Sequence, residues 1–335
     1  MGSKRPLAVL LVALLTGTSL QAGPGQEPAS LLLFPFFDSR AGAVTVVTVT
    51  NTHDDMTPDS RTGLMRGTVD VEFVYIDAAT CKEFNRVERL TPDDTFTAMV
   101  SAHHAAAVLG FFWIVARDPT TGRAIDHDYL VGQAVCLDAV HALEVGYNPI
   151  DSRALTGAGN PTDLDADDRL DLNGLEYEGL GDLAYVPRFY GQFGPAGIAS
   201  ELILLNLSGG ASFEASVDFD IFNDNESEFS AEHTFKCWEL LPLAAISGAF
   251  DNGFLAATGD DPDELLGFSS IETGWFIVNG GEANSTMKNI HDPAIVVMLI
   301  DRVGPYGATD LPFESEQKQF NATLYPRGVD GDNED

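Results

Sequence analysis

The stretch Phe213–Ile221 reads F-E-A-S-V-D-F-D-I and decides the fold. Apolar side chains occupy every second position in it, and the positions between them hold Glu, Ser or Asp. Because successive side chains of a β-strand point to opposite faces, this pattern predicts a strand with one buried and one solvated face. Residues 68–76 alternate in the same way, and Ala43–Thr50 (AVTVVTVT) is rich in β-branched residues, which favour strands.

Most of the remaining chain has the same character. Clusters of Gly, Pro, Asn and Thr separate the apolar runs, as expected for turns. Helical periodicity is weak, and short helices are expected only at 261–266 and 313–320. The sequence therefore predicts an all-β protein with antiparallel sheets. Its further strands are expected at 31–37, 95–101, 110–116, 129–137, 183–190, 201–207, 234–240, 274–279 and 294–301.

The order of elements in the first half returns in the second half. Phe34–Phe37 (FPFF) precedes a strand that ends in Thr50-Asn51-Thr52, and Val186–Tyr190 (VPRFY) precedes one that ends in Leu205-Asn206-Leu207. Each half continues with an alternating acidic strand, a cysteine and an aromatic strand that begins with glycine. The cysteines are Cys81 and Cys237, and the glycines are Gly110 and Gly274. This order indicates an internal duplication.

Two tandem antiparallel β-sandwiches of the immunoglobulin-like type explain the duplication, and a single large sandwich is the alternative. Composition sets the expected boundaries. These are a signal peptide at 1–22, a first sandwich at 23–147, an Asp/Gly-rich linker or loop at 148–182, a second sandwich at 183–304 and an acidic C-terminal tail at 305–335.

Four stretches of the first half have a familiar form: Leu31–Asp38 (LLLFPFFD), Val49–Thr52 (VTNT) at the end of a strand, Cys81–Arg86 (CKEFNR) and Leu90–Thr95 (LTPDDT). With them the chain resembles a group of exported bacterial proteins of unknown function, most clearly over about residues 30–135. The resemblance implies secretion and a β-rich body. It assigns no functional residue.

The N-terminus has the layout of a secretory signal peptide. Lys4 and Arg5 precede the apolar run Pro6–Leu15, and small and polar residues follow as far as Ala22. The run is shorter than the roughly 20 residues that a membrane-spanning helix needs. We therefore expect cleavage near Ala22 and a secreted or periplasmic mature protein with no membrane span.

The charge of the chain excludes one class of partner. Acids outnumber bases 51 to 18, which gives a net charge of −33. Such a surface repels phosphate backbones, so we expect no nucleic-acid partner. A glycan or a protein at the cell surface remains as the expected kind of partner.

The strongest local motif is an acidic loop with the spacing of a calcium site. Asp163, Asp165 and Asp167 stand at positions 1, 3 and 5 of a calcium loop, and Asp171 stands at position 9. Position 6 is Asp168 instead of the usual Gly, and position 12 is Gly174 instead of Glu. Glu176 or Glu178 would have to replace the missing ligand. The alternative is a solvated acidic linker without a metal.

Cysteine and histidine give weaker signals. Export makes one disulfide plausible, and Cys81–Cys136 is the favoured pair because both lie in the first expected sandwich; three reduced thiols are the alternative. Adjacent His103 and His104 are expected on opposite sides of a strand. His127 lies between two acids, which predicts a surface histidine with a raised pKa.

No catalytic motif stands out. Gly267–Ile271 (GFSSI) lacks the second glycine of a serine-hydrolase nucleophile turn, and no phosphate-binding loop or zinc motif occurs. We therefore expect a non-enzymatic exported protein with a surface-associated, adhesive or structural role, stabilised by calcium. A carbohydrate-binding module and a secreted hydrolase are the alternatives. Aromatic residues that would line a sugar-binding surface are Trp113, Trp275, Tyr129, Tyr147, Tyr185 and Tyr190.

Overall fold

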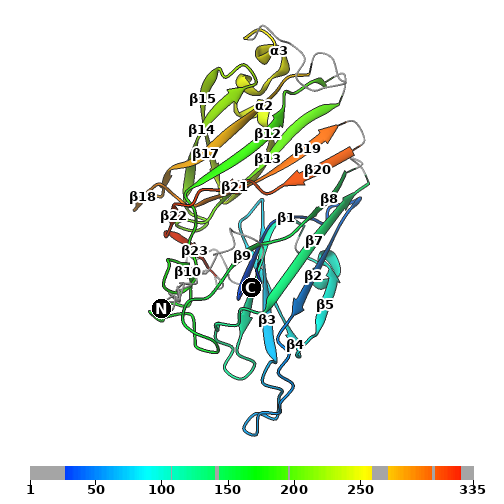
Figure 1. Ribbon diagram of the computed structural model, residues 1–335, viewed down its shortest axis with the longest axis vertical. Coiled ribbons are helices and arrows are strands. Elements are labelled where there is room, and N and C mark those ends of the chain that lie inside the picture. Colours follow the sequence, from blue (N-terminus) through cyan, green and yellow to red (C-terminus); the bar gives the residue numbers. More distant parts are fainter. Residues whose placement is uncertain are drawn as a thin grey trace, which may run out of the picture.

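The computed structural model describes residues 27–106, 108–139, 143–194, 197–258, 271–303 and 306–325. Within these residues the protein is all-β, and every pairing between its strands is antiparallel. Figure 1 shows the first half of the chain at one end of the molecule and most of the second half at the other end. The expected all-β class is thus confirmed. The signal segment and the expected helix at 261–266 lie outside the described residues.

Four sheets hold most of the described strands. Sheet I has the order β4 (Glu83–Leu90), β3 (Val69–Asp77), β6 (Leu109–Arg117), β1 (Leu31–Asp38) and β9 (Ile150–Ser152). Sheet II has the order β5 (Thr95–Met99), β2 (Ala43–Asn51), β7 (Leu130–Asp138) and β8 (Leu143–Tyr147). Sheet III has the order β16 (Trp238–Pro242), β13 (Ile198–Asn206), β19 (Ile295–Val303) and β20 (Tyr306–Asp310). Sheet IV has the order β15 (Glu228–Lys236), β14 (Glu214–Asn223), β17 (Thr273–Asn284), β12 (Leu183–Tyr190) and β21 (Phe313–Glu314), with β18 (Asn289–His291) paired to β17.

The two halves share one strand order. Sheet IV repeats sheet I strand for strand, and sheet III repeats sheet II. Pro35 in β1 and Pro187 in β12 each lie where the register with the neighbouring strand shifts. A bulge tolerates proline because its missing N–H is not needed there. The expected duplication is therefore present. The cysteines are not part of it, because Cys81 precedes β4 whereas Cys237 follows β15, the strand equivalent to β4.

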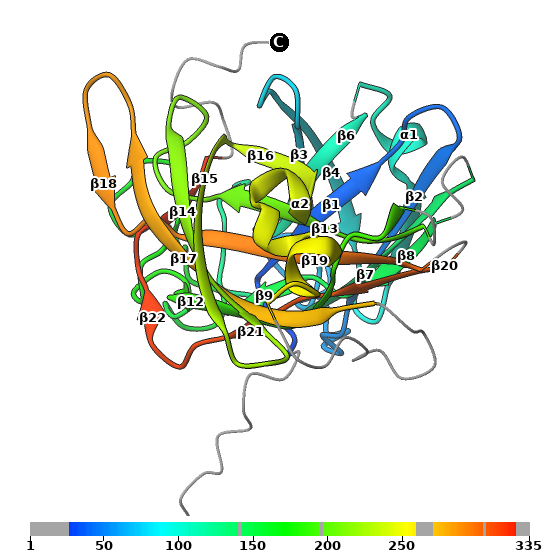
Figure 2. The same cartoon turned by 90° about the horizontal axis from the view of Figure 1, so that it is seen from above.

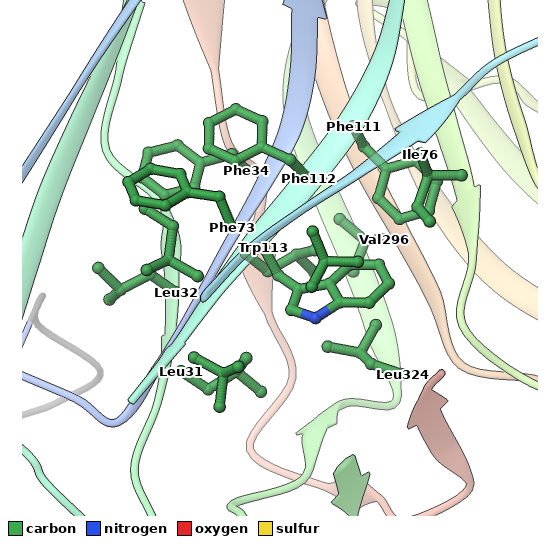
Figure 3. Packing of buried hydrophobic residues seen from close by; sticks show 14 of the residues in the cluster. Leu31, Leu32, Phe34, Phe73, Ile76, Phe111, Phe112, Trp113, Val296 and Leu324 are labelled. Carbon is green, nitrogen blue, oxygen red and sulfur yellow. The ribbon is translucent and has the colours of Figure 1, made fainter. Parts of the chain in front are cut away.

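The halves meet in a shared core. All eight residues of β1 are buried, so sheet I is covered on both faces. In β13 alternate side chains belong to different clusters: Leu202 and Leu204 pack with sheet IV, and Ile203 and Leu205 pack with the first half. Figure 3 shows Trp113 of β6 beside Val296 of β19 and Leu324. The expectation of two separate tandem sandwiches is too simple, because strands of the second half complete the core of the first.

The segment expected to link the halves, 148–182, carries short strands. Besides β9 it holds β10 (Leu170–Leu172) and β11 (Leu180–Gly181). These pair with β23 (Ala322–Leu324) and β22 (Lys318–Gln319), which lie in the part of the chain expected to be a tail from residue 305. Strands β21 and β22 also replace the helix expected at 313–320. Both segments are thus built into the fold as far as Tyr325.

Helices in the described residues are single turns. α1 (Val100–His103) follows β5, and α2 (Leu243–Ile246), a 3-10 turn η2 (Gly248–Phe250) and α3 (Asn252–Leu255) follow β16. Phe250 and Leu255 are buried in the cluster between sheets III and IV. α2 lies at the end of the molecule that Figure 2 views from above. No helix in the described part of the chain is long and apolar enough to cross a membrane.

Candidate metal centre

The acidic loop that begins at Asp163 is a turn held by hydrogen bonds to its first carboxylate. Both carboxylate oxygens of Asp163 accept backbone hydrogen bonds: the N–H groups of Ala166 (2.7 Å) and Asp167 (3.3 Å) donate to Oδ1, and that of Asp168 (3.2 Å) donates to Oδ2. These bonds curl the chain around the first acid. The curl brings the side chains at alternate positions to one side of the loop.

Five carboxylates lie on that side, in two overlapping groups of three. Ligand oxygens of Asp163, Asp165 and Glu176 lie within 4.8 Å of one another, and so do those of Asp165, Asp167 and Asp171. The two groups share Asp165. All four residues expected from the sequence are therefore brought together, and Glu176 joins them. Among the described residues, no other His, Cys, Asp or Glu side chains gather in this way.

The missing glycine at position 6 does not prevent the turn. Asp168 adopts a left-handed backbone conformation with φ of 62°, as does Ala166. Aspartate is among the residues that tolerate this region best, because its short polar side chain bonds locally. Further along, Gly174 has φ of 75° and turns the chain back. The reversal places Glu176, and not the exposed Glu178, beside the loop.

Glu176 is a buried carboxylate that the backbone holds in place. It is 3% exposed, and it accepts hydrogen bonds from the backbone N–H groups of Leu164 (2.7 Å) and Asp171 (3.3 Å). Burial raises its pKa, and the charges of Asp171 and Asp165 raise it further, although the two N–H donors oppose the rise. A bound cation would remove this electrostatic cost.

Asp171 occupies the first strand of the small β10–β23 pair. Burial raises the pKa of Asp171, and the nearby charges of Asp167 and Asp165 add to the rise, while a hydrogen bond with Thr323 lowers it. Its Oδ1 is inaccessible to solvent and has no hydrogen-bond partner among the described residues. Buried oxygen atoms are normally satisfied, so this atom is available to a ligand.

The donor set suits calcium. Calcium takes six to eight oxygen ligands, from carboxylates and carbonyls, at about 2.3–2.6 Å. Either group of three carboxylates supplies the acidic part of such a shell. Zinc prefers nitrogen and sulfur ligands, which the two groups lack. Arg169 forms an ion pair with Asp167 at 3.4 Å and so offsets part of the negative charge.

Other acidic patches do not converge. Asp218 and Asp220 lie on the outer face of β14, and Asp224 and Glu226 lie in the turn that follows. None of them belongs to a group of converging ligands. The sequence has a further acidic patch at Asp251, Asp260, Asp261, Asp263 and Glu264, of which only Asp251 lies within the described residues. Residues 267–270 of Gly267–Ile271 also lie outside them.

His103 and His127 are buried, and for His127 this differs from the expected surface position. His103 ends α1 instead of lying on a strand, and it contacts the hydroxyl of Tyr75 at 2.8 Å and Glu88 at 3.3 Å. His127 is 7% exposed, and burial followed by the charge of His53 lowers its pKa to about 4. The expected rise was wrong because loss of water outweighs the neighbouring acids. Sequence spacing carries no signal for these contacts.

The three cysteines form no disulfide. Cys81 lies in the turn between β3 and β4 of sheet I, with φ of 54°. Cys136 is 1% exposed on β7 of sheet II, where burial raises the pKa of its thiol. Cys237 lies between β15 and β16. The expected Cys81–Cys136 bridge is absent, and the alternative of three reduced thiols describes the structure.

The aromatic residues named from the sequence separate into core, exposed and half-buried residues. Trp113 and Tyr147 are core residues, at 2% and 6% exposed. Tyr129 and Trp275 are exposed at 37% and 38%. Tyr185 and Tyr190 are half-buried on β12. Only the exposed pair and the half-buried pair on β12 can contact a ligand.

Comparisons with known proteins identify no relative. No protein-family model matches the chain, and no curated protein matches it. Among solved structures, the chain is similar to the cowpea mosaic virus top component, the naturally occurring empty particles, with 10% sequence identity and a TM-score of 0.18. The alignment covers 94% of this chain and 100% of that one. A TM-score this low supports no conclusion about fold or function.

Proposed function

We propose that this protein is an exported, non-enzymatic structural protein with a surface-associated or adhesive role, and that calcium stabilises it at the loop 163–176. The observation that carries the proposal is the convergence of Asp163, Asp165 and Glu176 within 4.8 Å. Like charges this close repel, and a divalent cation converts the repulsion into attraction. Extracellular calcium modules often bind at only ~10⁻⁴–10⁻³ M, so an irregular loop suffices outside the cell.

Calcium at this loop would act on the whole fold. Leu170 and Leu172 of β10 are buried in the shared core, and they pair with Leu324 and Ala322 of β23. β10 lies within this loop, between Asp167 and Glu176. Calcium that orders the loop would therefore also hold the segment 148–182 and β23 in place. We further propose that each half is a sandwich of two facing sheets, which the two hydrophobic clusters support.

The test is a calcium titration of chelator-treated protein. A ligand that binds only the folded state at 100 times its Kd stabilises that state by about 2.7 kcal/mol. We expect the melting temperature to rise and saturate with CaCl₂, and calorimetry to give one site. Glu176→Gln should remove most of the response. Asp218→Asn is the matched control, because its carboxylate is acidic and exposed but lies outside the loop.

Two results would contradict the calcium site. One is a calcium response in Glu176→Gln equal to that of the wild type. The other is an equal loss of response in Asp218→Asn, which would indicate diffuse screening and not a site. Export is tested separately by N-terminal sequencing of the mature protein. We expect its first residue near Gly23.

A further inference from the structure

The outer face of sheet IV presents aromatic side chains in a row. Phe222 of β14 and Trp275 of β17 are cross-strand partners whose rings stack at 4.3 Å between centroids, with 12° between their planes. Ile277, two residues after Trp275, pairs with Tyr185 of β12, and Tyr185 pairs with Phe313 of β21. Residues two apart on a strand share a face, as do cross-strand partners. The row therefore crosses four neighbouring strands.

This row is accessible to a ligand. Trp275 is 38% exposed and Phe313 is 69% exposed, while the next residue along β17, Phe276, is fully buried in the core. Alternation along β17 therefore places the ring of Trp275 on the outer face and the ring of Phe276 in the core. Exposed apolar patches of this kind commonly mark interaction surfaces.

An acidic groove continues the same face. Its volume is ≈ 520 Å³, which lies within the range of about 300–1,000 Å³ that is typical of small-ligand sites. Its walls include carboxylates and hydroxyls from three strands, namely Glu214, Ser216, Asp218, Glu232, Thr234 and Glu282. Glu282 contacts His291 at 3.3 Å. For Asp218 and Glu232, no basic side chain lies within ion-pair distance in the described part of the chain.

The groove and the aromatic row are linked along β14. Asp218 and Phe222 both point outward, and four residues of strand separate them by about 13 Å. Asp220 lies between them on the same face. A ligand that engages both features must therefore be an extended chain with apolar faces and positive charges.

We propose that the outer face of sheet IV binds a polysaccharide that carries amino groups, of the β-linked glucosamine type. The C–H faces of pyranose rings stack on aromatic rings, and ammonium groups form charge-assisted hydrogen bonds with carboxylates. A neutral polysaccharide leaves the carboxylates uncompensated, and an acidic one is repelled. A basic peptide fits less well, because peptides that add to sheets use the backbone groups of an edge, and those of β14 and β17 are already paired.

The proposal is independent of the calcium site, which lies in another part of the fold. Binding is measured by calorimetry in saturating CaCl₂, so that failure of one proposal does not affect the other. The probes are a glucosamine hexasaccharide, its fully N-acetylated counterpart and hexalysine, below the pKa of the sugar amine. We expect the glucosamine chain to bind at least tenfold tighter than the acetylated chain, and added NaCl to weaken it.

Variants separate the two features of the face. Trp275→Ala should weaken binding of the glucosamine chain at least tenfold. Asp218→Asn should weaken it several-fold and reduce its dependence on salt. Tyr129→Ala is the matched control, because Tyr129 is 37% exposed but lies outside sheet IV. Melting curves confirm that each variant is folded.

Three results would overturn the proposal. Equal affinity for the free and acetylated chains would show that the carboxylates take no part. Tighter binding of hexalysine would assign the face to a basic peptide. Unchanged binding in Trp275→Ala, with the fold intact, would show that the aromatic row is not the contact surface.

Discussion

At the scale of single residues, His127 is the group whose burial has the clearest consequence. Its Nε2 lies 3.0 Å from Oδ1 of Asn51, and that oxygen also accepts the backbone N–H of His53. The Nδ2 group of Asn51 donates to the carbonyl groups of Gly67 and Thr91. Oδ1 is therefore the acceptor and Nε2 carries the proton. The neutral imidazole already satisfies this contact, and protonation would place an uncompensated charge in the interior.

This arrangement predicts a loss of stability in acid. The pKa of His127 falls from 6.5 to about 4 in the folded protein, so the unfolded chain takes up the proton first as the pH decreases. Between pH 7 and pH 5 the folded state should lose about 2 kcal/mol through this group. His127→Gln keeps a side-chain N–H without a titration. We expect urea unfolding to show a steeper loss for the wild type than for the variant.

The pH dependence of stability must be compared between the wild type and His127→Gln, because other groups also titrate in this range. Burial raises the pKa of Asp171 and of Glu176, so both contribute stability that grows as the pH falls, which is opposite to His127. Their contribution cancels in the difference between wild type and variant. Identical pH dependence in the two proteins would refute the role of His127. Measurements stop at pH 5 because the sequence pI is near 4.2.

At the scale of elements, the pair β10–β23 joins the loop 163–176 to the core. Leu324 is 2% exposed and pairs with Leu170. Leu324→Ala removes buried methyl groups and leaves a cavity, which costs about 2–4 kcal/mol in cores of this kind. Leu164→Ala serves as the control because Leu164 is 61% exposed. Chemical denaturation should show the large loss only for Leu324→Ala. An equal effect of both changes would contradict the packing of β23.

The duplicated glycines at the start of β6 and β17 make a second prediction at this scale. A Cβ at Gly274 would collide with the backbone carbonyl of Phe222 and the ring of Phe189, and one at Gly110 would collide with the carbonyl of Ile76. Gly110→Ala and Gly274→Ala should each cost more than about 2 kcal/mol. Gly122 has φ of 72° with open space around it, so Gly122→Ala should cost only about 1 kcal/mol. Thermal melts of the three variants test the equivalence of the halves, and a mild effect at either strand would refute it.

Whether the sequence predicts a strand depends on the burial and the length of that strand. Half-buried strands such as β2 and β14 carry the period of two, and their predicted bounds agree with the structure within two residues. β4 (EFNRVERL) was missed because it is a polar edge strand with only Leu90 fully buried. β10, β11, β22 and β23 are two or three residues long, and distant partners determine them. Local patterns in the sequence therefore do not predict these pairings.

For the candidate site too, the sequence predicts only the contacts between residues that are close along the chain. Asp163, Asp165, Asp167 and Asp171 are close in sequence, so their spacing alone predicts that they converge. Glu176 was one of two alternatives, and only the turn at Gly174 selects it over Glu178. The aromatic row on sheet IV could not be predicted, because it depends on the order of strands across the sheet.

At the scale of the whole molecule, charge sets the conditions for stability. The full chain carries a net charge of −33, and removal of the segment 1–22 would make it −35, because that segment holds two bases and no acid. Much of this charge lies on outer faces such as that of sheet IV, where carboxylates face each other across strands: Asp218 pairs with Glu232. Like charges directly opposite one another destabilise a sheet. Repulsion of this kind weakens the compact state at low ionic strength.

Salt and calcium should therefore stabilise the protein through separable effects. At 0.1 M salt the screening length is about 10 Å, which reduces repulsion between exposed carboxylates on neighbouring strands but acts less on the buried Glu176. We expect the melting temperature of chelator-treated protein to rise gradually with NaCl, without saturation at low concentration. CaCl₂ at matched ionic strength should add a saturable rise, which Glu176→Gln lacks while retaining the NaCl response. A flat response to both salts would mean that surface repulsion and the loop carboxylates contribute little to stability. A calcium effect no larger than that of ionic strength would mean that calcium acts on the loop only as it acts on the rest of the acidic surface.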